Sequence, residues 1–318
     1  MRDQWTRRNV LAGGAGLLGG VFGRPLMGRA TAVEPAPAAE RFTGWPISLN
    51  TSTLRGHKLP FTRVVEIAAQ AGYAGLEPWP DELDRHVQAG GSLEDAGKRI
   101  KDLGLKVTGG IAFYEWMVDD EQRRAAGLEE AKKRIDQFAR IGATHIAAPP
   151  AGDVKNVDLV RAAERYADLL KLAEGSGVVP AVEVWGFAGN GYRLGQCVCI
   201  ALESHRPEAC VLPDVYHLFK GGSGLDGVRR LNPAMLAGFH LNDYPAGLDR
   251  ARAKDADRVY PGDGVAPLVQ LFRDLRDIGY RGPMSIELFN PEYYKQDPLL
   301  VARTALEKTK RVIERALG

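Results

Sequence analysis

Short apolar runs alternate with amphipathic stretches along the chain from residue 46 onward. Eight of the runs have the length of a buried strand, and they are PISLNTS (46–52), AGLEP (74–78), LKVTGGIAF (105–113), THIAA (144–148), VVPAVEVW (178–185), ACVLPDVYH (209–217), LAGFHLND (236–243) and PMSIELF (283–289). The stretches between them have the spacing of helices. In LEEAKKRIDQFARIG, for example, Leu128, Ala131, Ile135 and Phe138 fall on one face. The pattern predicts a parallel sheet covered by helices, closed as a single-domain (β/α)8 TIM barrel.

Glycines stand where the predicted helices should end, just before the next strand. They are Gly72, Gly104, Gly142, Gly177 and Gly279. A doubly wound open sheet is the alternative architecture. It lacks support, because LNTSTLRGHK after the first strand carries no Gly-rich phosphate loop. The segment 243–264 is unusually long for a connection in a compact domain, and long loops of this kind tend to be functional.

Composition adds little to this picture. The chain has 318 residues, of which 45% are hydrophobic and 26% charged, and its net charge of +2 is small. There is no basic stripe with interleaved aromatic residues, so we expect no nucleic-acid partner. The cysteines Cys197, Cys199 and Cys210 have no spacing typical of a disulfide scaffold, and we interpret them as small buried apolar groups.

The first 32 residues follow a different pattern. Arg7 and Arg8 precede the apolar, Gly-rich run 10–23, and Ala30-Thr31-Ala32 offers an A-x-A cleavage site. This resembles a twin-arginine (Tat) export signal. We therefore predict a signal peptide over 1–32, a Pro/Ala-rich tether over 33–44, the barrel over 45–318, and a periplasmic location. The alternative is an uncleaved anchor, but the run is short of the ~20 apolar residues that a membrane span needs, so we expect no stable membrane anchor after cleavage.

Polar residues follow or end the last four predicted strands. They are Glu183, Asp214, His240 and Glu287. Active sites of barrels lie at these carboxyl ends, so the four side chains should point into one volume. An unpaired buried charge is very costly, and three close carboxylates would repel one another. One divalent cation would remove the conflict, and three oxygen donors with one imidazole suit Mn²⁺, Mg²⁺, Co²⁺ or Zn²⁺. The alternative for any single acid is a satisfied buried acid, for instance one paired with an arginine at the mouth of the barrel.

The chain resembles the xylose-isomerase-like TIM barrels of the sugar phosphate isomerase/epimerase family, over roughly residues 46–316. The group includes ketose 3-epimerases, hydroxypyruvate isomerase and inosose dehydratases. The most specific matches are Glu183, the D-x-x-H of Asp214 to His217, His240 in FHLND, and Glu287 in SIELF. The resemblance implies that Glu183, Asp214, His240 and Glu287 bind the metal, with Mn²⁺ favoured.

The resemblance also implies roles in catalysis. Glu183 and Glu287 are expected to be the catalytic acid/base pair, while His217 and Arg258 are expected to bind substrate. The epimerases carry a further substrate-binding glutamate, but here Gly189 falls near that position and Asn190 is the closest polar residue. The expected substrate is therefore a small sugar or polyol, and the missing glutamate argues against assigning a free ketohexose.

Three further residues are weaker candidates for substrate binding. Glu77 ends the second predicted strand, His57 follows the first, and Trp185 lies two residues beyond Glu183. Each has a structural alternative: a helix-capping or salt-bridged acid for Glu77, a solvated loop histidine for His57, and an aromatic residue that only packs for Trp185. Trp79, Trp116 and Phe187 are further aromatic residues that could form a wall of a sugar site.

The expected reaction is removal of a proton next to a carbonyl through a metal-stabilised enediolate. Return of the proton gives epimerisation or isomerisation, and loss of a hydroxyl gives dehydration. An isomerase or epimerase is the leading interpretation. The alternative is a dehydratase or lyase that acts on a keto-sugar or keto-inositol with the same site. A non-catalytic periplasmic sugar-binding protein is the least favoured of the three. Cleavage of nucleic acid by a multi-zinc cluster is disfavoured, because only His217 and His240 lie at suitable strand ends. Self-association into a homo-oligomer is left open.

Overall fold

The structure is a computed structural model that describes residues 44–318. The predicted signal peptide and all but the last residue of the predicted tether lie outside this range. Eight short parallel strands form the inner layer, and they are β1 (Ile47–Asn50), β2 (Gly75–Glu77), β3 (Lys106–Val107), β4 (His145–Ala148), β5 (Val179–Glu183), β6 (Val211–Leu212), β7 (Phe239–Leu241) and β8 (Met284–Ile286). The predicted TIM barrel in one domain is confirmed.

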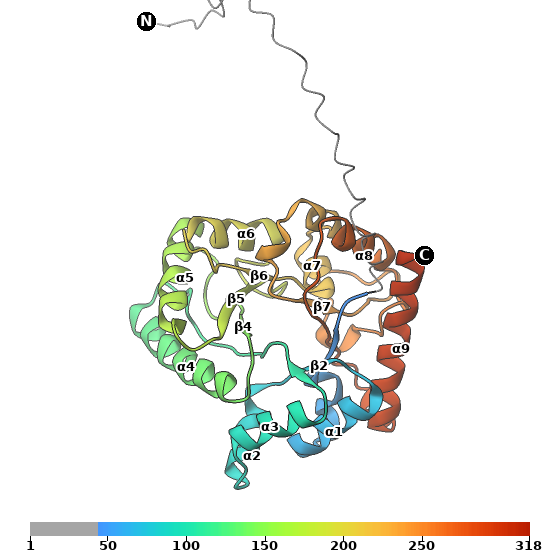
Figure 1. Ribbon diagram of the computed structural model, residues 1–318. Coiled ribbons are helices and arrows are strands. Elements are labelled where there is room, and N and C mark those ends of the chain that lie inside the picture. Colours follow the sequence, from blue (N-terminus) through green and yellow to red (C-terminus); the bar gives the residue numbers. More distant parts are fainter. Residues whose placement is uncertain (1–43) are drawn as a thin grey trace, which may run out of the picture. The chain divides into compact units, whose positions relative to one another are not determined.

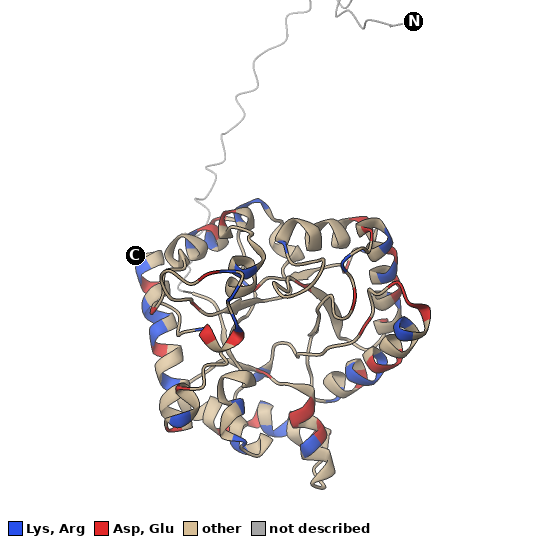
Figure 2. Cartoon of the chain, turned by 180° about the vertical axis from the view of Figure 1, so that it is seen from behind, with Lys and Arg blue, Asp and Glu red and all other residues tan. Residues whose placement is uncertain are grey.

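Helices form a ring around the strands (Figure 1). They are α1 (Phe61–Ala71), α2 (Pro80–Gln88), α3 (Leu93–Asp102), α4 (Glu121–Arg140), α5 (Leu159–Ala173), α6 (Leu194–Glu203), α7 (Val215–Gly221), α8 (Leu268–Asp277) and α9 (Pro298–Leu317). Figure 2 shows the charged residues mainly on these outer helices, while the strands carry few. Within residues 44–318, no helix combines the length and the apolar character that crossing a membrane requires.

The barrel is hydrogen-bonded as two arcs. One sheet has the order β3-β2-β1-β8-β7, and the other has the order β4-β5-β6. Isolated parallel bridges, Val211 with Leu236 and Asp214 with His240, connect β6 to β7. At the opposite seam the amide of Ala147 donates to the carbonyl of Gly110 over 2.8 Å. The strand contacts are therefore sparsest at two seams, and one of these runs past Asp214 and His240.

Four of the five predicted glycine stops lie one or two residues beyond a helix end and have φ between +78° and +88°. Gly72, for example, takes the left-handed conformation that closes α1. The expectation for Gly177 was wrong, because α5 already ends at Ala173 and Gly175 takes the left-handed position there. The connection between β2 and β3 holds two helices, since Gly90 and Gly91 interrupt it and Ser92 caps α3.

The cysteines mostly match expectation. All three are free thiols, and Cys197 and Cys210 are buried. Cys199 is only partly buried, so the prediction fails for this residue. It lies on α6, whose Leu202 is also exposed to solvent.

Candidate active site

The four predicted ligands come together at the carboxyl ends of β5 to β8. Glu183 is the last residue of β5, Asp214 caps the N-terminus of α7, His240 lies in β7, and Glu287 follows β8. None of the four is more than 3% exposed. Asp214 is held in place because its carboxylate accepts the backbone N–H of His217 over 2.7 Å.

His240 lies at the centre of this group. Its Nδ1 is 3.8 Å from Glu183 Oε1, 3.7 Å from Asp214 Oδ2 and 3.4 Å from Glu287 Oε2. Asp214, His240 and Glu287 each offer one atom that could bind a metal, and these three atoms lie within 4.8 Å of one another. The roles of the four residues as ligands remain a prediction, but their side chains occupy one small volume.

The electrostatics of the cluster fit a bound divalent cation. Burial, together with the nearby Glu287 and Asp214 carboxylates, raises the pKa of Glu183 well above the usual carboxyl range. Glu183 Oε2 is buried without a hydrogen-bond partner among the described residues. Burial alone would lower the pKa of His240, but the carboxylates of Glu77 and Glu287 outweigh it and raise that pKa well above its usual value. The cluster thus has an excess of buried carboxylate and an unused oxygen, which a cation would satisfy.

Arg258 supplies one fixed positive charge beside the cluster. Its side chain is almost fully buried, and its Nη1 donates to Asp214 Oδ2 over 2.8 Å and to Glu287 Oε2 over 3.0 Å. Burial opposes the charge on Arg258, yet Asp214, Asp255 and Glu287 raise its pKa far above the ordinary value. The guanidinium therefore stays charged and limits the repulsion between two of the predicted ligands.

His217 lies against the other end of that guanidinium, with its Nε2 3.1 Å from Arg258 Nη2. Burial lowers the pKa of His217 to about 4, so the ring is neutral at neutral pH. Because a guanidinium can only donate, Nε2 of His217 must accept, and the proton of the ring is left on Nδ1. That Nδ1 is buried and has no partner within the described part of the chain, so it is available to donate to a ligand.

The long loop 243–264 carries Arg258 into the site. Its first residue, Asp243, accepts the backbone N–H groups of Tyr244 at 2.8 Å, Gly262 at 3.0 Å and Ala266 at 2.8 Å, which ties the two ends of the loop together. Asp255, in a short 3-10 helix of the loop, accepts from Arg258 Nη2 over 2.7 Å. The loop is thus an anchored support for Arg258, and its functional role stays a prediction.

Aromatic side chains form a continuous row of contacts that ends at His217. Phe113 contacts Trp79 at a ring distance of 5.9 Å and Trp185 at 5.4 Å, and Phe187 contacts His217 at 5.6 Å. Phe113 and Phe187 are 42% and 37% exposed. Both side chains are therefore partly accessible, although Lys220 Nζ lies 5.0 Å from the centre of the Phe187 ring. Trp116, by contrast, is fully buried, and its Nε1 donates to the carbonyl of Pro149 over 2.9 Å.

Glu77 and His57 differ in their surroundings. Glu77 lies directly against His240, with 3.0 Å between Glu77 Oε2 and His240 Nε2. Both ring nitrogens of His57 lie near backbone carbonyl groups, that of Leu54 at 3.1 Å and that of Gln296 at 2.9 Å. Neither geometry tests the predicted contacts with substrate.

Two residues that contact the predicted ligands were not predicted from the sequence. Asn50, the last residue of β1, donates to Glu77 Oε2 over 2.9 Å and to Glu287 Oε1 over 3.2 Å. Asn242, just after β7, donates to Asp214 Oδ2 over 2.9 Å. Both follow the rule that polar residues at strand ends face the site, so Asn50 at the end of ISLN was the available signal.

Comparison with known proteins matches this architecture. The family model described as "Xylose isomerase-like TIM barrel" matches residues 65–312. The chain belongs to the xylose isomerase-like TIM barrel family. Two curated relatives are an inosose isomerase of Bacillus licheniformis, 29% identical over 76% of this chain and 86% of its own, and a fructoselysine 3-epimerase of Shigella flexneri, 30% identical over 81% of this chain and 95% of its own. Relatives of this xylose isomerase-like chain are therefore enzymes.

A solved structure shares the fold. The crystal structure of the IOLI protein with a bound zinc atom superposes with a TM-score of 0.78 at 22% identity, covering 85% of this chain and 99% of that protein. This agreement concerns the backbone architecture of the xylose isomerase-like barrel.

Proposed function

We propose that this protein is a divalent-metal-dependent isomerase or epimerase that removes a proton next to the carbonyl of a small sugar or polyol ketone. The observation that carries the proposal is the convergence of Glu183, Asp214 and Glu287 on Nδ1 of one buried histidine, His240. The names of the two curated relatives support an isomerase, and the zinc atom in the IOLI structure supports a metal.

Glu183, Asp214, His240 and Glu287 would hold the cation. When bound, the cation would supply stabilisation for the negative charge that develops on the substrate's oxygens. We favour Mn²⁺, with Mg²⁺, Co²⁺ and Zn²⁺ as alternatives, since oxygen donors outnumber nitrogen donors three to one in the proposed set.

The protein's own groups would perform the proton transfers. Glu183 and Glu287 both have raised pKa values, caused mainly by burial, so each is a stronger base when ionised than an exposed carboxylate. The free N–H on Nδ1 of His217 would donate to a substrate oxygen. Arg258 contacts Asp214, Glu287 and His217, and it would hold these three side chains in position while the charge on the substrate changes.

The region after β5 supports a substrate other than a simple ketohexose. A Cβ atom at Gly189 would lie 3.0 Å from the backbone of Lys155, so no side chain fits there without movement. Asn190 is buried and donates to the carbonyl of Val157 over 2.8 Å, which makes it part of the framework. The additional glutamate expected from the resemblance thus has no substitute at these two positions.

The test is NMR of candidate keto-sugars and keto-inositols with metal-loaded protein in D₂O. We expect deuterium uptake at the carbon next to the carbonyl, followed by an epimer or isomer. Glu287→Gln should retain coordination through its amide oxygen and lose turnover by about 10²–10⁴-fold, the usual contribution of a general acid or base. A product lighter by one water would favour the dehydratase, and full turnover in metal-loaded Glu287→Gln would refute the proton-transfer role.

We also propose export to the periplasm by the Tat route. The support is the arginine pair Arg7-Arg8, the apolar run that follows it, and the A-x-A site at 30–32. A small-molecule ketone would reach the enzyme in that compartment without an intracellular kinase, which fits an unphosphorylated substrate.

A further inference from the structure

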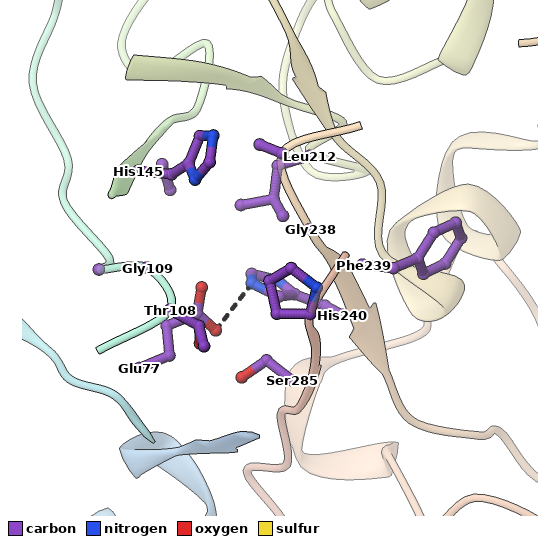
Figure 3. A pocket seen from close by; sticks show the side chains of 13 residues that line it. Glu77, Thr108, Gly109, His145, Leu212, Gly238, Phe239, His240 and Ser285 are labelled. Atoms are coloured by element: carbon purple, nitrogen blue, oxygen red, sulfur yellow. Dashed lines mark ion pairs between the residues drawn. The ribbon is translucent and has the colours of Figure 1, made fainter. Parts of the chain in front are cut away.

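Glu77 lies beside the proposed metal site without belonging to the four proposed ligands. It ends β2, is 4% exposed, and points toward His240 across the barrel interior (Figure 3). Its Oε2 is 3.0 Å from Nε2 of His240, while the opposite nitrogen of that ring, Nδ1, faces the carboxylates of Glu183, Asp214 and Glu287. The imidazole therefore stands between one carboxylate on its Nε2 side and three on its Nδ1 side.

The carboxylate of Glu77 is confined. Asn50 donates to Oε2 over 2.9 Å, and Trp79 Nε1 in turn donates to Asn50 Oδ1 over 3.0 Å. On the other side, a Cβ atom at Gly109 would come within 2.7 Å of Glu77 Oε1. Glycine at 109 thus gives the carboxylate the room to lie where it does, and Asn50 keeps it there.

The cavity beside Glu77 is too small for a substrate. The cavity that Glu77 and His240 share with Ser285 has a volume of about 10 Å³, enough for roughly one water molecule. Ser285 Oγ in its wall is buried and has no hydrogen-bond partner among residues 44–318, so one water there would find polar contacts. A sugar hydroxyl on its carbon skeleton could not reach Glu77 through this volume.

The chemistry of imidazole gives Glu77 a different task. A neutral imidazole has one N–H, and an ionised carboxylate can only accept. A carboxylate at Nε2 therefore favours the form with the proton on Nε2 and the lone pair on Nδ1. Ligating histidines in proteins commonly have such a partner on the other nitrogen, and its loss typically weakens metal binding by about 10–100-fold.

We propose that Glu77 is a positioning residue, which holds His240 with its proton on Nε2 and its Nδ1 lone pair directed at the cation between Glu183, Asp214 and Glu287. The assignment rests on the proposed function and replaces the contact with substrate predicted for Glu77. Asn50 extends the same support, because it links Glu77 to Glu287, one of the proposed ligands.

The first experiment measures metal affinity without any substrate. Zn²⁺ binding to the wild type and to Glu77→Ala is compared by competition with a chromogenic chelator. We expect about 10–100-fold weaker binding in Glu77→Ala. Glu77→Gln should weaken Zn²⁺ binding less than Glu77→Ala. Asn50 donates to the position of Oε2, so the amide oxygen of the glutamine should lie there and still accept from Nε2 of His240. Gly109→Ala should also weaken binding, since its methyl group displaces the carboxylate.

Glu82→Gln is the matched control. Glu82 is equally buried, at 5% exposure, but it contacts Thr51 and the backbone of Trp79 rather than His240. Its substitution should leave the Zn²⁺ dissociation constant within about twofold of the wild type. A general loss of stability, by contrast, would affect Glu82→Gln and Glu77→Ala alike, and thermal melts of each variant identify it.

The second experiment observes the proton directly. In Zn²⁺-loaded protein labelled with ¹⁵N-histidine, the signals absent from His240→Gln belong to His240. We expect a protonated Nε2 and a metal-bound Nδ1. Zinc on Nε2 would overturn the assignment, as would an unchanged dissociation constant in folded Glu77→Ala, and either result would leave the proposed function intact. A wild type that binds no divalent metal would overturn both.

Discussion

Glu183→Gln is expected to make the metal-free protein more stable and the enzyme inactive. Glu183 Oε2 has no hydrogen-bond partner among the described residues, and Asp214 and Glu287 lie around the same histidine nitrogen. A buried polar group left unsatisfied costs about 1–3 kcal/mol. Glutamine removes the like charge and brings an N–H₂ group that can donate to a neighbouring carboxylate.

The size of the gain depends on pH. The folded-state pKa of Glu183 is raised, so this group contributes stability below its unfolded pKa and loses it as pH rises through the folded pKa. At low pH the wild-type group is already neutral and the variant gains little. At high pH the full difference of about 1–3 kcal/mol applies, which corresponds to a rise in Tm of about 2–6 °C for a domain of this size.

The assay is thermal unfolding of chelator-treated wild type and Glu183→Gln across a pH series. Adding Mn²⁺ or Zn²⁺ should narrow or reverse the difference, because the carboxylate of the wild type binds a cation more tightly than the amide oxygen of the variant, and a ligand at 100 times its Kd stabilises the protein by about 2.7 kcal/mol. Glu183→Gln should also lose turnover in the D₂O assay. The reasoning is refuted if the metal-free variant melts below the wild type at high pH, or if the difference between the two does not grow with pH.

Three further predictions concern the site, its loop and export. Metal uptake should release protons, because Glu183 and His240 both have raised pKa values, and calorimetry in two buffers of different ionisation enthalpy counts them. Asp243→Ala leaves three loop N–H groups without their acceptor, so we expect a loss of about 3 kcal/mol and faster proteolysis within 243–264. Arg7→Lys combined with Arg8→Lys should retain the protein in the cytoplasm, and an unchanged periplasmic yield on fractionation would contradict the Tat assignment.

The architecture and the convergence of the four candidate ligands could be predicted from the sequence because both depend on periodicity and strand ends. Glu183, Asp214, His240 and Glu287 each end or follow an apolar run, and parallel strands in a barrel bring such residues together. The direction of each side chain could not be predicted in the same way. Glu77 also ends its strand, yet it faces His240, because Gly109 leaves space there and Asn50 holds the carboxylate.

Local interruptions were harder to predict than the barrel itself. The helical pattern between β2 and β3 is interrupted at Gly90-Gly91. A second helix begins after this interruption, with Ser92 as its N-terminal cap. The position of Phe113 was missed for a different reason. Its apolar run reads as buried strand, but β3 ends at Val107 and the chain continues as a loop that leaves the ring 42% exposed.

The division of the barrel into two arcs has a mechanical consequence for the site. Glu183 and Asp214 belong to the arc β4-β5-β6, whereas His240 and Glu287 belong to the other, and only isolated bridges join β6 to β7 between them. An ion bound by all four residues would crosslink the two arcs across that seam. Opening of the seam and release of the ion would then be a single motion, so backbone amides of β6 and β7 should exchange with solvent at a rate that reports directly on metal dissociation.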